Sequence, residues 1–165
     1  MKLKAFQEYY PPQFSHCFGC GTDNAHGLHI MSYWADEAAG ETIAIFTPSE
    51  EYTGGFPGFV YGGLIAAILD CHGNATASAA GYRHYGRALG SEPALRYVTA
   101  NLNLNYRHPT PMGQSLELGA KITTTTDRKV CMNLWLIANG LTTVEGTMTS
   151  VLLPLANQQL RSKAF

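Results

Sequence analysis

The sequence carries little charge, and the charge that it has is balanced. Only 14% of its 165 residues are charged, and 11 Lys and Arg stand against 12 Asp and Glu, for a formal net charge of −1. A chain without a basic excess gives no global case for nucleic-acid binding, so we expect no nucleic-acid partner. The hydrophobic content of 45% predicts a packed domain rather than a disordered chain.

Long hydrophobic runs are also missing. The first 20 residues lack the apolar core of about 7–15 residues that marks a secretory signal peptide. The longest apolar candidate, residues 59–69, is far short of the ~20 residues that span a bilayer, and it runs into Asp70. We therefore expect no membrane partner and a cytoplasmic location. In that compartment the cysteines are expected to be reduced thiols, and they are Cys17, Cys20, Cys71 and Cys131.

The length suits one domain over residues 1–165, with an irregular N-terminal arm over about 1–25 and a short C-terminal tail over about 155–165. Residues 62–80 carry apolar side chains at helical spacing without proline, and Gly81 is expected to end this helix. Strands are predicted at 27–36, 41–48, 95–108, 115–127, 130–140 and 141–154. A sheet built from short turns, with one long helix to cover a face, predicts an α+β fold.

The predicted helix carries one acidic residue, Asp70, on a stripe of small residues that also includes Asn74. Two interpretations stay open from the residues alone. Asp70 is either a structural carboxylate paired with an N–H group or an arginine, or a general base or nucleophile at the edge of a pocket. The preceding Gly62 and Gly63 favour a site, because glycines at a helix start leave backbone N–H groups free to polarise a carbonyl.

The stretch GFPGFVYGGLIAAILD, residues 55–70, resembles the signature of hotdog-fold acyl-CoA thioesterases of the 4-hydroxybenzoyl-CoA and phenylacetate-pathway types. That signature has His-Gly-Gly, a run of apolar and small residues, and then Asp or Glu nine positions after the His. Here Tyr61 stands at the His position and Asp70 at the acid position. The resemblance implies a hotdog fold, in which an antiparallel sheet wraps around one long central helix. It also implies acyl-CoA as substrate, a homodimer or homotetramer, and no cofactor beyond the coenzyme A of the substrate.

The resemblance further implies roles for individual residues. The backbone N–H of Gly62 would bind the thioester oxygen, with Gly63 beside it. Asp70 of a neighbouring subunit would activate water or attack the carbonyl, and Asn74 would assist it. Tyr61 departs from the family pattern, since a phenol cannot serve as an imidazole base. A non-catalytic protein that binds acyl-CoA or an acyl carrier is therefore the alternative function.

Other polar and aromatic residues are candidates for substrate binding. Under the resemblance, Arg107, His108, Arg128 and Lys129 would hold the phosphates of coenzyme A, whereas without it they are solvated surface charges. Phe59 and Tyr82 are candidates for an acyl pocket, with simple packing as the alternative.

A second constellation has the spacing C-x2-C-x5-H-x2-H, formed by Cys17, Cys20, His26 and His29. Its spacing is shorter than that of a zinc finger. We therefore favour packed thiols in a tight glycine turn and expect no metal.

Overall fold

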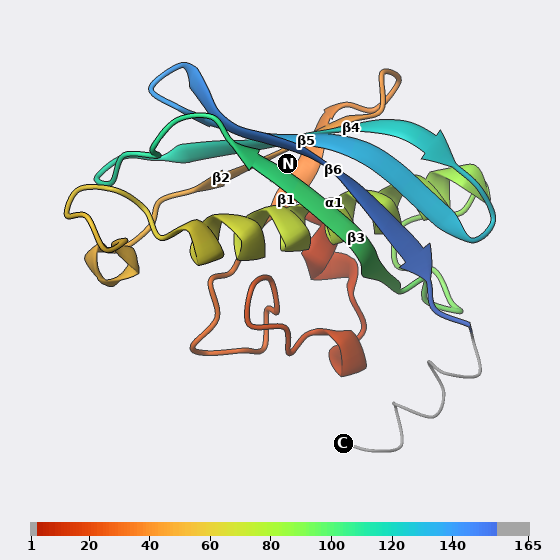
Figure 1. The fold of residues 1–165 in the computed structure, drawn as a ribbon. Coiled ribbons are helices and arrows are strands. Elements are labelled where there is room, and N and C mark those ends of the chain that lie inside the picture. The colour runs from red at the N-terminus through yellow and green to blue at the C-terminus, as the bar shows by residue number, and fades with distance from the viewer. Residues whose placement is uncertain (1–2, 155–165) are drawn as a thin grey trace.

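The computed structural model describes residues 3–154, and it places one long helix against one antiparallel sheet (Figure 1). The helix is α1 (Gly62–His84). The strands are β1 (Ser32–Asp36), β2 (Glu41–Phe46), β3 (Tyr97–Tyr106), β4 (Leu116–Thr125), β5 (Lys129–Ala138) and β6 (Leu141–Leu152). Short 3-10 turns are η1 (Phe6–Tyr9), η2 (Pro12–Phe14) and η3 (Glu50–Tyr52). The predicted α+β architecture is confirmed, and the predicted tail at 155–165 lies outside the described residues.

The strand order in the sheet is β1-β2-β4-β5-β6-β3, and every neighbouring pair is antiparallel. Short hairpins join β1 to β2, β4 to β5 and β5 to β6. The chain that leaves α1 returns as β3, which pairs with β6 at the edge of the sheet. Most of the side chains of β3 are exposed, so this strand offers an open edge over its ten residues.

The helix is buried on most of its circumference because it lies between two layers. Figure 1 shows the sheet on one side of α1 and the N-terminal segment on the other. Its large apolar side chains, Leu64, Ile65, Ile68 and Leu69, are at most 4% exposed and pack in the main core. The small residues of α1 allow close approach to the sheet: a Cβ on Gly73 would lie 2.2 Å from the sulfur of Met148 on β6. This packing fixes which face of the helix meets the sheet.

The helix is one turn longer than predicted, because Gly81 does not end it. Gly81 is a packing residue: a Cβ there would lie 2.5 Å from the hydroxyl oxygen of Tyr97 at the start of β3. The helix instead stops before Gly86, whose φ of +62° suits a residue that follows a helix.

The first strand is shorter than predicted, because residues 27–31 pair with the arm instead of the sheet. The N–H of Leu28 donates to the carbonyl of Phe18 at 2.7 Å, and the N–H of Ile30 donates to that of Gly19 at 3.0 Å. These bonds tie the N-terminal segment to the domain.

Within residues 3–154, no helix is both long enough and apolar enough to cross a bilayer.

Candidate active site

The start of α1 exposes backbone donors. The first hydrogen bond of the helix runs from the N–H of Ile65 to the carbonyl of Tyr61, at 3.2 Å. The N–H groups of Gly62, Gly63 and Leu64 therefore precede the helical ladder and have no acceptor within the helix. The partial positive charge of the helix dipole is concentrated at the same end. Together these groups suit an oxygen that carries developing negative charge.

A pocket of about 320 Å³ lies at this helix start. It brings together four residues that the sequence singled out, and these are Phe59, Gly62, Arg107 and His108. Gly62 lies on its wall without a side chain, so a ligand can approach the backbone there. Arg107 is held by Glu145, with its Nε 2.7 Å and its Nη2 2.6 Å from the same carboxylate oxygen. Both side chains of that ion pair are about half exposed, so the remaining guanidinium donors stay accessible.

Tyr106, the last residue of β3, is a pocket residue that sequence reasoning missed. Its hydroxyl donates to the carbonyl of Gly62 at 2.7 Å and so fixes the helix start against the edge strand. Burial, and then the nearby Tyr61, raise the pKa of Tyr106, which keeps this phenol a donor. The available signal was its position directly before Arg107 and His108 at the end of an alternating strand.

Tyr61 lies against the glycine pair. Its side chain is 57% exposed, and a Cβ on Gly63 would lie 2.4 Å from its Cζ. The absence of a side chain at Gly63 therefore leaves room for the tyrosine ring beside the helix start, although neither residue lines the pocket.

The carboxylate of Asp70 terminates a directed chain of hydrogen bonds. Ser150 on β6 donates to the amide oxygen of Asn74 at 3.0 Å, and the amide nitrogen of Asn74 donates to Thr99 on β3 at 2.8 Å. The hydroxyl of Thr99 then donates to Oδ1 of Asp70, while the amide nitrogen of Asn74 lies 3.4 Å from Oδ2. Each donor points toward the acid, so the chain orients Asp70 as an acceptor. Sequence reasoning identified Asn74 but missed Thr99 and Ser150.

One chain does not bring the two halves of this site together. Gly62 and Asp70 are eight residues apart on one helix, which corresponds to about 12 Å of axial rise. Their contacts on β3 are also separate, since Gly62 meets Tyr106 at one end of the strand and Asp70 meets Thr99 near the other.

Three further predicted binding residues lie at the opposite end of α1. Tyr82 is 5% exposed, accepts a hydrogen bond from the N–H of Leu95 at 3.1 Å and belongs to the core. Arg128 and Lys129 follow Asp127, which is 2.9 Å from His84 at the helix end. Within one chain these residues are separated from Gly62 by the length of a 23-residue helix.

Other candidates have structural partners. Ser78 donates to the carbonyl of Leu95 at 3.2 Å, and His72 is fully buried beside Ser32 and Thr42. The histidines of the zinc-like spacing, His26 and His29, are both exposed.

The cysteines of that spacing meet a third cysteine instead of the histidines. The sulfur atoms of Cys17, Cys20 and Cys71 all lie within 4.8 Å of one another. Hydrogen bonds from the thiols of Cys20 and Cys71, and from the backbone N–H groups of Cys20 and Gly19, lower the pKa of Cys17. The same bond to Cys17 is the main reason that the pKa of Cys20 is raised, to about 12.

Comparison with known proteins identifies the fold and family. Residues 57–144 match the model of the Thioesterase superfamily. A thioesterase superfamily protein from Shewanella loihica is 41% identical, with a TM-score of 0.64 over 86% of this chain and 96% of that one. No curated protein matches the chain.

More distant solved structures share the fold alone. The Escherichia coli PaaI protein of the phenylacetic acid degradation operon is 14% identical, with a TM-score of 0.58 over 77% of this chain and 81% of that one. The smu.793 protein of Streptococcus mutans, solved with acetyl CoA bound, is also 14% identical, with a TM-score of 0.58 over 75% and 88% of the two chains. The expected hotdog fold is thereby confirmed.

Proposed function

We propose that this chain, which belongs to the thioesterase superfamily, hydrolyses acyl-CoA thioesters to a free acid and coenzyme A. The observation that carries the proposal is the pocket at the start of α1, where free backbone donors at Gly62 adjoin Arg107 and His108. The acetyl-CoA complex of the Streptococcus mutans relative supports the same class of ligand.

In the reaction, the N–H of Gly62 binds the thioester oxygen and stabilises the negative charge that develops there. The carboxylate of Asp70 accepts a proton from the attacking water, or attacks the carbonyl itself. The bond between the acyl carbon and sulfur then breaks, and coenzyme A leaves as a thiolate that takes up a proton. With water as the nucleophile this step releases the acid directly, whereas attack by Asp70 leaves an acyl–Asp70 anhydride, which a water molecule then cleaves to free the acid and restore the carboxylate. The hydrogen-bond chain through Thr99 and Asn74 holds the carboxylate in position for either role.

The edge strand supports a site shared between two chains. Antiparallel pairing of β3 with a second copy, centred between Leu102 and Asn103, would bring Thr99 of one chain opposite Tyr106 of the other. Thr99 contacts Asp70 and Tyr106 contacts Gly62, so this pairing would bring the partner's Asp70 toward Gly62. Two such sites would form in a dimer with twofold symmetry.

The same pairing gives the distant binding residues a role. An antiparallel partner presents the opposite end of its own helix beside this helix start. Arg128 and Lys129 of the partner subunit would then join Arg107 and His108 in holding the phosphates of coenzyme A. No cofactor enters the proposal, because coenzyme A is part of the substrate. The cytoplasmic location stays a prediction.

Release of free thiol from short, long and aromatic acyl-CoAs tests the proposal. Asp70→Asn keeps the shape of the side chain but removes the base, so turnover should fall by a factor on the order of 10²–10⁴. Asp23→Asn is the matched control, since that carboxylate is exposed and outside the site. Absence of turnover for every acyl group, with acyl-CoA still bound, would instead establish the alternative function of a non-catalytic binding protein.

The role of Tyr61 is tested by restoring the histidine of the family signature. Tyr61 is exposed beside the helix start, so Tyr61→His should leave stability unchanged. A rise in turnover would show that the tyrosine limits catalysis, whereas a fall would assign it a role of its own.

A further inference from the structure

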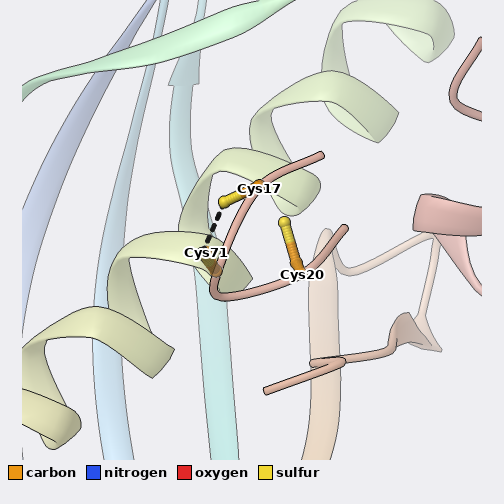
Figure 2. Close-up of side chains that lie close together, drawn as sticks. All are labelled: Cys17, Cys20 and Cys71. Carbon is orange, nitrogen blue, oxygen red and sulfur yellow. Dashed lines mark hydrogen bonds between the residues drawn. The ribbon is translucent and has the colours of Figure 1, made fainter. Parts of the chain in front are cut away.

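Three cysteine side chains from two distant parts of the chain meet on the side of α1 that faces the N-terminal segment (Figure 2). Cys17 and Cys20 lie in the loop before β1, whereas Cys71 lies on α1, one residue after Asp70. The sulfur atoms of Cys17 and Cys71 are 3.7 Å apart, and all three sulfur atoms lie within 4.8 Å of one another. Cys20 and Cys71 are buried, whereas Cys17 is partly exposed.

The loop is closed around these sulfur atoms by its own backbone. The N–H of Gly21 donates to the carbonyl of Cys17 at 2.8 Å, and the N–H of Asp23 donates to that of Ser15 at 3.0 Å. A Cβ on Gly19 would lie 2.2 Å from the sulfur of Cys71, and one on Gly21 would lie 2.4 Å from the carbonyl oxygen of Ser15. Both glycines are therefore required for the loop to reach the helix, and the convergence of the thiols depends on them.

The spacing of the sulfur atoms fits a metal ion. Zinc binds thiolate sulfur at about 2.3 Å in tetrahedral geometry, which places two ligating sulfur atoms about 3.8 Å apart. The separation of 3.7 Å between Cys17 and Cys71 already matches that value. The third sulfur atom lies close enough to complete the set by a small side-chain adjustment.

We propose that Cys17, Cys20 and Cys71 form a structural Zn²⁺ site that fastens the N-terminal loop to α1. Three thiolates occupy three tetrahedral positions, and the partly exposed side of Cys17 leaves the fourth to a water molecule, so this ligand set is more open than the four protein ligands usual in structural zinc sites. Binding releases the three thiol protons to solvent and oxidises nothing. The site is separate from the proposed hydrolysis, although it fixes the helical turn that carries Asp70.

The zinc content of the full chain, purified under reducing conditions without chelators or a histidine tag, tests the site. One zinc ion per chain is expected in the wild type, and none in Cys71→Ser. Cys131→Ser is the matched control, because Cys131 lies on β5 beside Thr149 and outside the cluster, so it should keep its zinc. Cys17→Ser, in the partly exposed loop, replaces Cys71→Ser if that variant does not fold.

Cobalt provides a second measurement that does not depend on activity. Co²⁺ added to the metal-free wild type and Cys131→Ser should give an intense thiolate-to-cobalt charge-transfer band, which Cys17→Ser should lose. A wild type that binds neither metal when fully reduced would overturn the proposal. So would zinc that remains in the Cys17 and Cys71 variants, or a purified chain whose mass shows a disulfide between two of the three cysteines.

Discussion

His72 contributes a pH-dependent part of the stability, because it is buried without a carboxylate partner among its contacts. Its two ring nitrogens lie 2.9 Å from the hydroxyl of Ser32 and 3.3 Å from that of Thr42. Burial lowers the pKa of His72 from 6.5 to about 4, against a smaller opposing effect of a hydrogen bond with Thr42. The imidazole is therefore neutral in the folded chain at neutral pH.

The sign of the pH effect follows from this difference. Below pH 6.5 the unfolded chain takes up a proton at His72 that the folded chain does not bind until about pH 4. The free energy of unfolding should therefore fall as the pH drops from 6.5 to 4, by about 3 kcal/mol in total. Urea unfolding at several pH values measures it, and His72→Gln should flatten this part of the profile. His26→Gln, at an exposed position, should not, and an unchanged profile in His72→Gln would contradict the assignment.

The hydroxyl group of Tyr97 packs against Gly81 but lacks a hydrogen-bond partner among the described residues. Among the described residues this oxygen is buried and has no hydrogen-bond partner. Tyr97→Phe removes the unpaired group and keeps the ring, so it should leave stability unchanged or raise it by up to about 1 kcal/mol. Thermal unfolding measures the change, and a clear loss of stability would show that the hydroxyl has a partner in solution.

The adjacent Gly81 should tolerate no side chain. A Cβ there would also lie 2.7 Å from the ring carbon Cε2 of Tyr97, so Gly81→Ala should cost about 1–3 kcal/mol, and Tyr97→Phe should rescue it only in part. Gly55→Ala is the matched control, because nothing lies within 4 Å of the added carbon. Equal stability of the two alanine variants would contradict the packing at Gly81.

At the scale of the element, a single substitution at the start of α1 can remove one backbone N–H group. Gly62 is the first residue of the helix, a position where proline fits, and Tyr61 before it has φ −59° and ψ 126°, as a residue that precedes proline requires. The nearest neighbour of a Cβ on Gly62 would be the side chain of Tyr106, at 3.5 Å, which is an ordinary contact distance. Gly62→Pro therefore deletes the N–H and should leave the helix intact.

Gly62→Pro should lower turnover by a factor on the order of 10²–10³, the usual effect of losing one oxyanion donor. Gly62→Ala is the control, because it adds a side chain but keeps the N–H, and it should remain active. Initial rates of thiol release, with circular dichroism to verify the helix, compare the two variants. A proline variant as active as the alanine variant would show that this N–H does not bind the thioester oxygen.

The helix and the strands show which features of the fold can be predicted from the sequence alone. Helical spacing and strand alternation predicted α1 and all six strands, because both patterns report directly which side chains are buried. The end of α1 was placed too early, because the role of Gly81 depends on Tyr97, a residue sixteen positions away in the chain. The start of β1 was placed too early for a similar reason, since residues 28 and 30 bond to the arm.

The sequence predicted part of the candidate site: the residues of one helix, and Arg107 and His108 through the family resemblance. Gly62, Asp70 and Asn74 lie on one helix, whereas Thr99, Tyr106 and Ser150 reach them through the sheet. The spacing of Cys17, Cys20, His26 and His29 does not indicate the cluster that forms, in which Cys71 takes the place of both histidines. Such contacts between distant segments leave no periodic signal in the sequence.

At the scale of the whole molecule, a dimer would explain two features together. These are the open edge of β3 and the separation of Gly62 from Asp70. An exposed edge strand invites pairing with another strand. We expect the chain to be a dimer or a tetramer in solution. Light scattering coupled to size-exclusion chromatography measures the molar mass that decides this. A monomer that hydrolyses acyl-CoA at full rate would contradict a site shared between chains.

The most direct test of the shared site combines two inactive variants. Gly62→Pro and Asp70→Asn are co-expressed with different affinity tags, and the mixed dimer is isolated by two successive purifications. One of its two sites would contain both an intact Gly62 and the partner's intact Asp70. The mixed dimer should therefore release thiol from acyl-CoA at about half the wild-type rate, although each parent variant is nearly inactive. A mixed dimer as inactive as its parents, beside an active wild type, would contradict a site built from two chains.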